Sequence, residues 1–195
     1  MEVREPPATY IAYRALPEDA PRYEIIAGAG SLTPSPNRYH QLVSARLYKR
    51  LSDFVEANEL GEVYYAPFDV ILSENDVVNP DILFVARARL AIIHYEGVFG
   101  PPDLVVEIIS PTSTRRDLEQ KLALYARYGV REYWIADPAS QTVDIWISAG
   151  APLDTRQVLA GEGTLVSGIL PGLEIPMSRI FAGLLSPEFR KPKID

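Results

Sequence analysis

Apolar side chains recur at helical spacing in two stretches of this chain, which predicts two main helices. The first is expected to begin at Ser35, which can cap a helix whose first residue is Pro36, and to stop at Gly61. The second spans Leu118–Tyr128 and is ended by Gly129. The apolar stripe of the first helix consists of Tyr39, Val43, Leu47, Leu51, Phe54 and Val55.

Short apolar runs bounded by turn residues predict strands around these helices. The run Leu104–Ile109 is almost continuously apolar, which is typical of a strand buried on both faces. It precedes the second helix, and a strand at Glu132–Ala136 follows that helix, so residues 104–136 predict a right-handed crossover between parallel strands. The other expected elements are strands at Tyr23–Ile26, Glu62–Ala66, Phe68–Leu72, Ile82–Val85, Thr142–Ile147, Thr164–Val166 and Leu173–Ile175, and a short helix at Ser178–Leu184.

These elements predict an α/β fold of mixed α+β type, with a mixed β-sheet flanked by helices and extended by extra antiparallel hairpins. A chain of 195 residues is long enough for one domain with a sizeable core. Residues 1–20, which are rich in proline and acid, are expected to form a loose N-terminal arm. Residues 21–185 are expected to form a single domain, followed by a C-terminal tail at 186–195.

The composition is that of an ordinary globular protein, with 47% hydrophobic and 23% charged residues. The chain has no cysteine, which excludes disulfides, thiolate catalysis and cysteine-bound zinc. Every apolar run is far shorter than a membrane span, and the charged N-terminus lacks the apolar core of a signal peptide. We therefore expect no membrane partner and a cytoplasmic location.

The net charge of −7 argues against a broad basic surface that binds nucleic acid non-specifically. It does not argue against a nuclease, because carboxylates of an active site contribute to this count and a bound metal offsets them. Arg115 and Arg116 stand where a phosphate-facing loop would need them. The alternative for this pair is the solvated start of a helix.

Two acidic residues, Asp81 and Glu107, stand within or at the start of apolar runs. A buried carboxylate is costly to desolvate without a compensating partner. Two such carboxylates without a histidine or cysteine cluster favour a hard, oxygen-binding cation such as magnesium. The alternatives are that Asp81 bonds a nearby backbone amide in a turn and that Glu107 forms a structural salt bridge.

Lys121 falls inside the apolar arc of the second helix, near Leu118 and Tyr125. Its ammonium is expected to reach back to the end of the Glu107 strand, where it would act on an anion. The alternative is that the side chain extends along the apolar surface to solvent. With the two carboxylates, this lysine points to metal-dependent cleavage of phosphodiesters.

Glu24 and His40 are possible accessory residues. Glu24 resembles Glu107 as an acid within an apolar strand, although a surface position would also explain it. His40 lies one turn into the first helix and faces inward. We expect both at the rim of the same site, with His40 bonded to a carboxylate or a substrate phosphate. The alternative for His40 is a hydrogen-bonded core histidine.

Several short motifs in a fixed order resemble those of the Uma-type family of restriction endonucleases, which is placed in the PD-(D/E)xK nuclease superfamily. The resemblance covers roughly residues 20–185. The motifs are Tyr23-Glu24-Ile25-Ile26, residues 34–40, Pro80-Asp81, residues 102–111, Asp117, Lys121 and residues 129–134.

The resemblance implies a restriction-endonuclease-like core in which Asp81 and Glu107 bind Mg²⁺ or Mn²⁺ and Lys121 positions or activates the attacking water. Two departures stand out. Ile109 occupies the place where the superfamily usually has its lysine, and Lys121 in the following helix would replace it. The turn after the first strand is Ala27-Gly28-Ala29, where family members tend to have acid–Gly–acid.

The expected function is therefore metal-dependent hydrolysis of DNA by an endonuclease, with Asp81, Glu107 and Lys121 as catalytic residues. A homodimer or higher homo-oligomer is expected, because a symmetric partner lets a small nuclease reach both strands. One alternative is a catalytically inactive nucleic-acid-binding or assembly module on the same fold. Another is a metal-independent hydrolase that uses a carboxylate pair, as glycosidases do.

Overall fold

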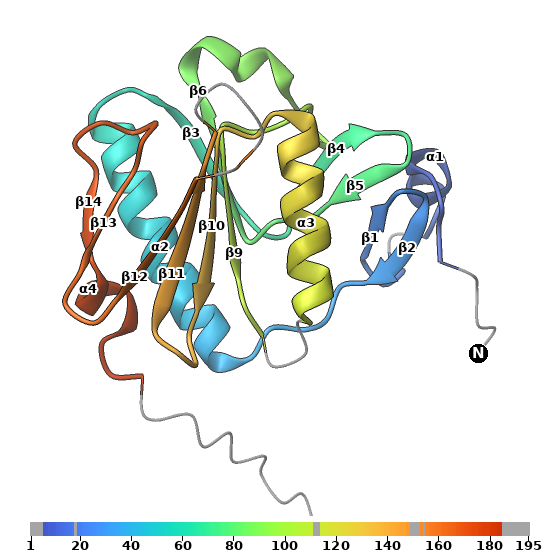
Figure 1. Ribbon diagram of the computed structural model, residues 1–195. Coiled ribbons are helices and arrows are strands. Elements are labelled where there is room, and N and C mark those ends of the chain that lie inside the picture. The colour runs from blue at the N-terminus through green and yellow to red at the C-terminus, as the bar shows by residue number, and fades with distance from the viewer. Residues whose placement is uncertain (1–5, 18, 111–113, 149–152, 154, 185–195) are drawn as a thin grey trace, which may run out of the picture.

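A six-stranded mixed sheet, here called the central sheet, organises the computed structural model (Figure 1). The structure describes residues 6–17, 19–110, 114–148, 153 and 155–184. Strands β9 and β10 are parallel and the other neighbours are antiparallel, which confirms the predicted mixed sheet. In spatial order the strands are β12 (Thr155–Ala160), β11 (Thr142–Ile147), β10 (Glu132–Asp137), β9 (Leu104–Ile108), β6 (Ile82–Ala86) and β3 (Gly61–Tyr65).

A second six-stranded sheet is built from shorter strands, several of which the sequence pattern did not reveal. Two to four residues, as in β2, β5, β7 and β8, are too few to establish an alternating pattern. In spatial order this sheet contains β2 (Ala29–Leu32), β1 (Tyr23–Ile26), β5 (Asp76–Val78), β4 (Asp69–Ser73), β8 (Gly97–Phe99) and β7 (Ile93–His94). A separate hairpin pairs β13 (Thr164–Val166) with β14 (Glu174–Pro176).

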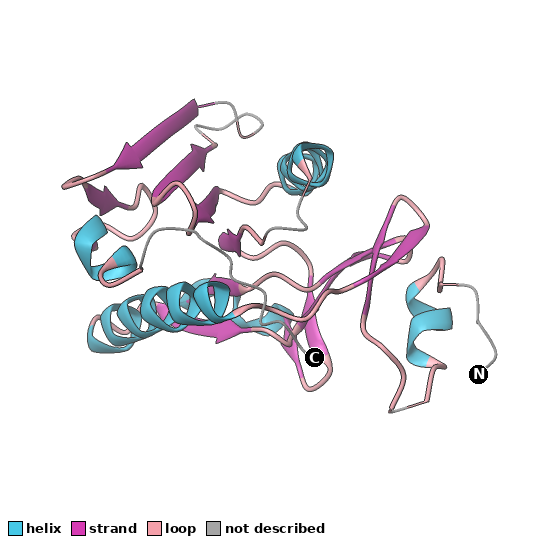
Figure 2. Cartoon of the chain, turned by 90° about the horizontal axis from the view of Figure 1, so that it is seen from below, coloured by secondary structure: helices cyan, strands magenta, loops and turns pink. Residues whose placement is uncertain are grey.

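Four α-helices and one 3₁₀ helix accompany the sheets in the described part of the chain. The short helix α1 lies beside the second sheet, apart from the other helices (Figure 2), within the segment expected to be a loose arm. None of the described helices is both long and apolar enough to cross a membrane. The helices are α1 (Tyr10–Arg14), α2 (Arg38–Ala57), the 3₁₀ helix Arg87–Ile92, α3 (Arg115–Tyr128) and α4 (Met177–Phe181).

The capping residue of α2 differs from the predicted one, whereas the end of α3 agrees with the prediction. The expected cap at Ser35 is wrong, because Asn37 caps α2 by accepting hydrogen bonds from the backbone amides of Tyr39 and His40. An asparagine oxygen at this position satisfies two amides that the helix leaves unpaired. Helix α3 ends as predicted at Gly129, whose φ of 82° is in the left-handed region that favours glycine.

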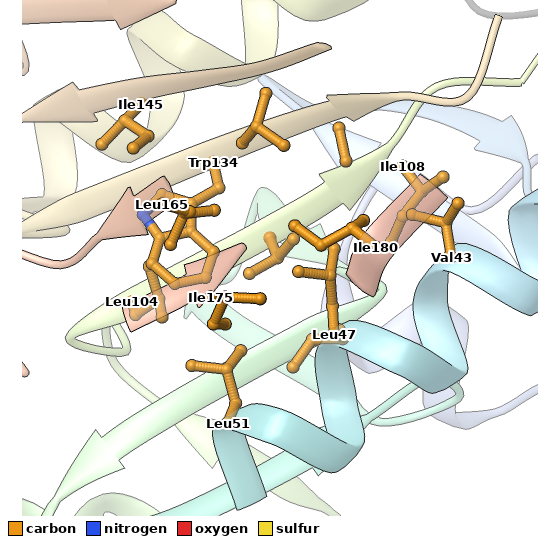
Figure 3. Close-up of a cluster of buried hydrophobic side chains, with 14 of the residues drawn as sticks. Val43, Leu47, Leu51, Leu104, Ile108, Trp134, Ile145, Leu165, Ile175 and Ile180 are labelled. Atoms are coloured by element: carbon orange, nitrogen blue, oxygen red, sulfur yellow. The ribbon is translucent and has the colours of Figure 1, made fainter. Parts of the chain in front are cut away.

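The central sheet is covered by α2 on one face and by α3 on the other (Figure 1). Side chains alternate along β9, so Leu104, Val106 and Ile108 pack toward α2 whereas Val105 packs toward α3. The layer on the α2 side is closed by the β13–β14 hairpin and α4 (Figure 3). By this alternation Glu107 belongs to the α3 face, which brings it to the side chains of that helix.

Asp103 directly precedes β9 and is completely buried. Its carboxylate accepts a hydrogen bond from the Ala86 amide at 2.8 Å and pairs with Arg89 at 3.0 Å and Arg131 at 3.5 Å. These three partners, which come from segments distant in sequence, compensate the desolvation of the carboxylate. Asp103 is thus a structural residue.

We predict that Asp103→Ala lowers the free energy of unfolding by about 1–3 kcal/mol, because the Ala86 amide loses its buried acceptor. Urea unfolding followed by circular dichroism measures this change. Asp53→Ala is the matched control, since Asp53 is 63% exposed and pairs with Lys49 one turn away. The control should change stability by no more than about 0.5 kcal/mol. Equal effects of the two substitutions would contradict the structural role of Asp103.

Candidate active site

Asp81 and Glu107 are brought together by the pairing of β6 with β9. Ile82 pairs with Val106 in this antiparallel ladder, so the position before Ile82 stands opposite Glu107. Asp81 Oδ2 accepts a hydrogen bond from the amide of Ile108 at 2.7 Å. This bond matches the structural alternative for Asp81, a carboxylate that satisfies a backbone amide. It also fixes the Asp81 side chain beside the end of the Glu107 strand.

Lys121 joins two carboxylates from different sheets. Its Nζ lies 2.8 Å from Glu107 Oε1 and 2.9 Å from Glu24 Oε1. Lys121 comes from α3, Glu107 from β9 and Glu24 from β1, so α3 links the central sheet to the second sheet (Figure 1). The ammonium therefore reaches the Glu107 strand instead of solvent, and 14% of the Lys121 side chain is exposed.

Tyr125 is a member of the cluster that sequence reasoning missed. Its hydroxyl donates a hydrogen bond to Glu107 Oε1 at 2.9 Å, on the same oxygen that Lys121 contacts. Lys121 and Tyr125 are four residues apart in α3 and therefore point in the same direction. The sequence contained this signal, because Tyr125 lies in the same helical arc as Lys121. Both Lys121 and Tyr125 donate to Oε1 of Glu107, and neither donates to Oε2.

Asn79 is a second residue of the cluster that sequence reasoning missed. Its backbone amide donates a hydrogen bond to Glu24 Oε1 at 3.0 Å, the oxygen that also pairs with Lys121. Asn79 stands directly before Pro80-Asp81 in sequence. The segment that leads into β6 therefore positions Glu24 as well as Asp81. Nothing in the local sequence indicates this contact, because Glu24 and Asn79 are 55 positions apart.

The electrostatic environment of Glu107 is strongly perturbed. Burial raises the pKa of Glu107, the Lys121 ammonium lowers it, and the charges of Glu24 and Asp81 raise it again, to about 7. Burial also acts to lower the pKa of Lys121, but the carboxylates of Glu107 and Glu24 outweigh it and hold that pKa well above its ordinary range. Lys121 is therefore a permanent cation, whereas Glu107 takes up or releases a proton near neutral pH.

His40 reaches the cluster from the first turn of α2. Its Nε2 lies 3.1 Å from the carboxylate of Asp81, and only 13% of its side chain is exposed. Its Nδ1 is buried and has no hydrogen-bond partner among the described residues. The structure thus places both accessory residues, Glu24 and His40, against members of the Asp81–Glu107–Lys121 cluster.

Arg115 and Arg116 lie outside these contacts. Both occupy the exposed first turn of α3. Arg115 Nε pairs with Glu119 Oε1 at 2.7 Å along the helix, and 92% of its side chain is exposed. This environment matches the alternative given for the pair, a solvated helix start. A role in phosphate contacts stays a prediction.

The donor set bears on which ion the cluster could hold. In the described residues, no three side chains of the histidine, cysteine, aspartate and glutamate types are grouped closely enough to ligate an ion. Asp81 nevertheless stands opposite Glu107 in the register of the paired strands, and the charges of Asp81, Glu24 and Lys121 all act on Glu107. Mg²⁺ is commonly bound through one or two carboxylates with water at its other positions. These residues therefore fit a hard divalent cation.

The fold has a counterpart among solved structures. It is similar to a crystal structure described as a "putative nuclease belonging to DUF820" from Anabaena variabilis ATCC 29413, with a TM-score of 0.77 and 20% sequence identity. The match covers 92% of this chain and 100% of that chain. At this level of identity the likeness shows the fold alone, and it confirms the predicted fold class.

The sequence comparisons identify the family. No curated protein is similar enough to this chain to be counted as a relative. The sequence pattern of the Uma2 family, described as "Putative restriction endonuclease", matches residues 11–178. This match spans most of the 195 residues and agrees with the resemblance seen in the motifs. The chain therefore belongs to the Uma2 family.

Proposed function

We propose that this protein is an endonuclease that hydrolyses DNA phosphodiester bonds with the help of Mg²⁺ or Mn²⁺, in the manner of the PD-(D/E)xK superfamily. Membership of the Uma2 family supports nuclease activity in general. The observation that carries the specific proposal is the contact of Lys121 with Glu107, next to Asp81 on the paired strand. A permanent cation beside two carboxylates in one buried cluster suits the hydrolysis of an anionic ester.

Asp81 and Glu107 are the proposed metal-binding residues. A divalent cation bound there would polarise the phosphate, lower the pKa of a bound water and stabilise the leaving oxygen. Within the protein, Asp81 is held by the Ile108 amide and Glu107 by Lys121 and Tyr125. These hydrogen bonds keep the two carboxylates in place before substrate arrives, which reduces the reorganisation needed during the reaction.

Lys121 is the proposed charge-stabilising residue. During hydrolysis a water oxygen attacks phosphorus, the bond to the leaving oxygen breaks, and negative charge grows on the phosphoryl oxygens and the leaving oxygen. The Lys121 ammonium, held by Glu24 and Glu107, lies in a largely buried site where its interaction with that charge is stronger than in water. Glu24 thus positions the lysine through a direct ion pair.

Tyr125 is proposed as a positioning residue for Glu107. Its hydroxyl favours the ionised form of that carboxylate, so Tyr125→Phe should raise the pKa of Glu107. We expect cleavage at pH 7 to fall about tenfold or more, since a hydrogen bond to a charged group contributes about 1.5–3 kcal/mol. The acid limb of the pH–rate profile should move to higher pH.

The matched control for Tyr125→Phe is Tyr128→Phe. It removes a hydroxyl from the same helix, but this one bonds Asp76 instead of Glu107. The control should leave the pH–rate profile in place. An unchanged profile for Tyr125→Phe, or the same shift for both variants, would contradict the positioning role.

The proposed activity is tested on supercoiled plasmid, linear duplex and single-stranded circular DNA, each with Mg²⁺, with Mn²⁺ and with EDTA. We expect cutting in the presence of either cation and none with EDTA. Absence of metal-dependent cutting on all three substrates would overturn the proposal in favour of an inactive nucleic-acid-binding or assembly module. Sedimentation of the same preparation tests the homo-oligomer expected from the sequence.

A further inference from the structure

An exposed aromatic residue lies on the strand next to the Asp81 segment. Tyr65 is the last residue of β3, the edge strand of the central sheet, and 58% of it is exposed. It pairs with Ile82, and the amide of the following residue, Ala66, donates a hydrogen bond to the carbonyl oxygen of Asp81 at 2.9 Å. Backbone contacts therefore place Tyr65 directly next to the segment that presents the Asp81 carboxylate.

The Tyr65 ring is supported from one side by α2. Tyr48 of this helix packs edge-on against it, with ring centroids 4.6 Å apart and an interplanar angle of 63°. The contact restricts the orientation of Tyr65 while more than half of the residue stays open to solvent. The same helix supplies His40 to Asp81 at its first turn. The ring and the carboxylate cluster thus share both β6 and α2 as neighbours.

A second flat group stands at the start of α2. The guanidinium of Arg38 lies 4.8 Å from the centre of the Tyr39 ring, in the turn that also carries His40. Stacked guanidinium and aromatic planes suit nucleobases, because every base offers a flat π face. Flat side chains therefore stand on β3, next to the Asp81 segment, and in the turn of α2 that carries His40.

The charge of the protein favours stacking over phosphate contacts as the source of affinity. The net charge is −7, and Arg115 at the start of α3 is paired with Glu119. Binding along a duplex backbone depends on many lysine and arginine contacts to phosphates. Stacking of bases on aromatic rings contributes affinity without that requirement.

We propose that Tyr65 stacks on an unpaired nucleobase next to the bond to be cut, so that the substrate class is single-stranded DNA, including ends and flaps. Bases inside a duplex hide their flat faces in the stack, and only an unpaired base can place one on a protein ring. This inference rests on the proposed function for its choice of nucleic acid. It goes further by naming the form of the DNA and the residue that selects it.

Binding of a fluorescein-labelled 12-nucleotide DNA with phosphorothioate linkages, which resist hydrolysis, tests the inference by fluorescence anisotropy in Mg²⁺. The same sequence is offered as a single strand and as a duplex. Wild-type protein should bind the single strand more tightly. Tyr65→Ala should weaken single-strand binding by about 5- to 150-fold, the loss expected for one stacked base. Tyr65→Phe, which keeps the ring, should bind like wild type.

Tyr95→Ala is the matched control, because Tyr95 is fully exposed and lies in the turn between β7 and β8 of the second sheet. It should leave binding unchanged. Tighter binding of the duplex, or single-strand binding that Tyr65→Ala does not alter, would overturn the inference. If the protein cuts duplex DNA and Tyr65→Ala does not change the rate, the proposed function holds but this inference fails. Tyr65-dependent binding without any cutting would support the inference and overturn the activity.

Discussion

Lys121→Ala should abolish DNA cleavage while the protein still binds a divalent cation. The ammonium is proposed to act on charge that develops during the reaction, so its loss should appear in the rate. Removal of one charge-stabilising donor typically costs on the order of 10²–10³ in rate. Initial rates of cutting measure the first effect, on whichever of the three DNA substrates the wild-type protein cuts fastest. Calorimetric titration with Mn²⁺ measures the second, because Lys121 is not a proposed metal ligand.

The interpretation of Lys121→Ala needs two controls. The variant leaves Glu24 and Glu107 without their shared cation, so thermal unfolding must show that it still folds cooperatively. Lys49→Ala removes a lysine that is 74% exposed and paired with Asp53, and it should cut DNA at the wild-type rate. A folded Lys121→Ala protein that cuts as fast as wild type would remove Lys121 from the mechanism.

Glu107→Gln should remove both cleavage and metal binding. Glutamine keeps the size of the side chain and can still accept the Tyr125 hydrogen bond, but it supplies no negative charge for a cation. In the wild type we expect the Mn²⁺-induced rise in Tm to be larger at pH 8 than at pH 6, because the ionised carboxylate binds the metal. In Glu107→Gln the rise should be small at both pH values.

The pH dependence follows from the raised pKa of Glu107. Its ordinary pKa is 4.5, and in the folded protein it is about 7. Between these values the folded state holds a proton that the unfolded state has released, so this group makes the metal-free protein less stable as pH rises from about 4.5 to about 7. Glu107→Gln should lack this loss of stability.

Thermal unfolding in EDTA from pH 4.5 to 8 measures the contribution of Glu107. The control is Glu119→Gln, which changes a glutamate that is 63% exposed and paired with Arg115. It should behave like wild type in both the pH series and the Mn²⁺ series. A Glu107→Gln protein that retains the full Mn²⁺-induced rise in Tm would show that the cation binds elsewhere.

The elements with strong periodicity were predictable from the sequence. The apolar run of β9 and the amphipathic pattern of α3 gave the parallel crossover to β10, and Thr142–Ile147 matches β11 residue for residue. Helix α2 was found from its stripe of apolar side chains. These patterns are local, and burial on a sheet or helix face acts on them directly.

Long-range polar contacts set the limit of sequence reasoning. The local sequence around Asp103 does not reveal its ion pairs, because Arg89 and Arg131 come from other segments of the chain. Likewise, Glu24 was ambiguous until the second sheet brought it to Lys121, 97 positions further along the chain. A charged residue in an apolar run indicates that a partner is needed, but the tertiary fold determines which residue that partner is.

Manganese located in a crystal by its anomalous scattering tests most directly whether Asp81 and Glu107 form a metal centre. A soaked crystal of the wild-type protein should show a peak bound by both carboxylates, with metal–oxygen distances of roughly 2.0–2.6 Å. The same soak of Glu107→Gln should show no peak there. A wild-type crystal with manganese bound elsewhere and none between Asp81 and Glu107 would contradict the proposed site.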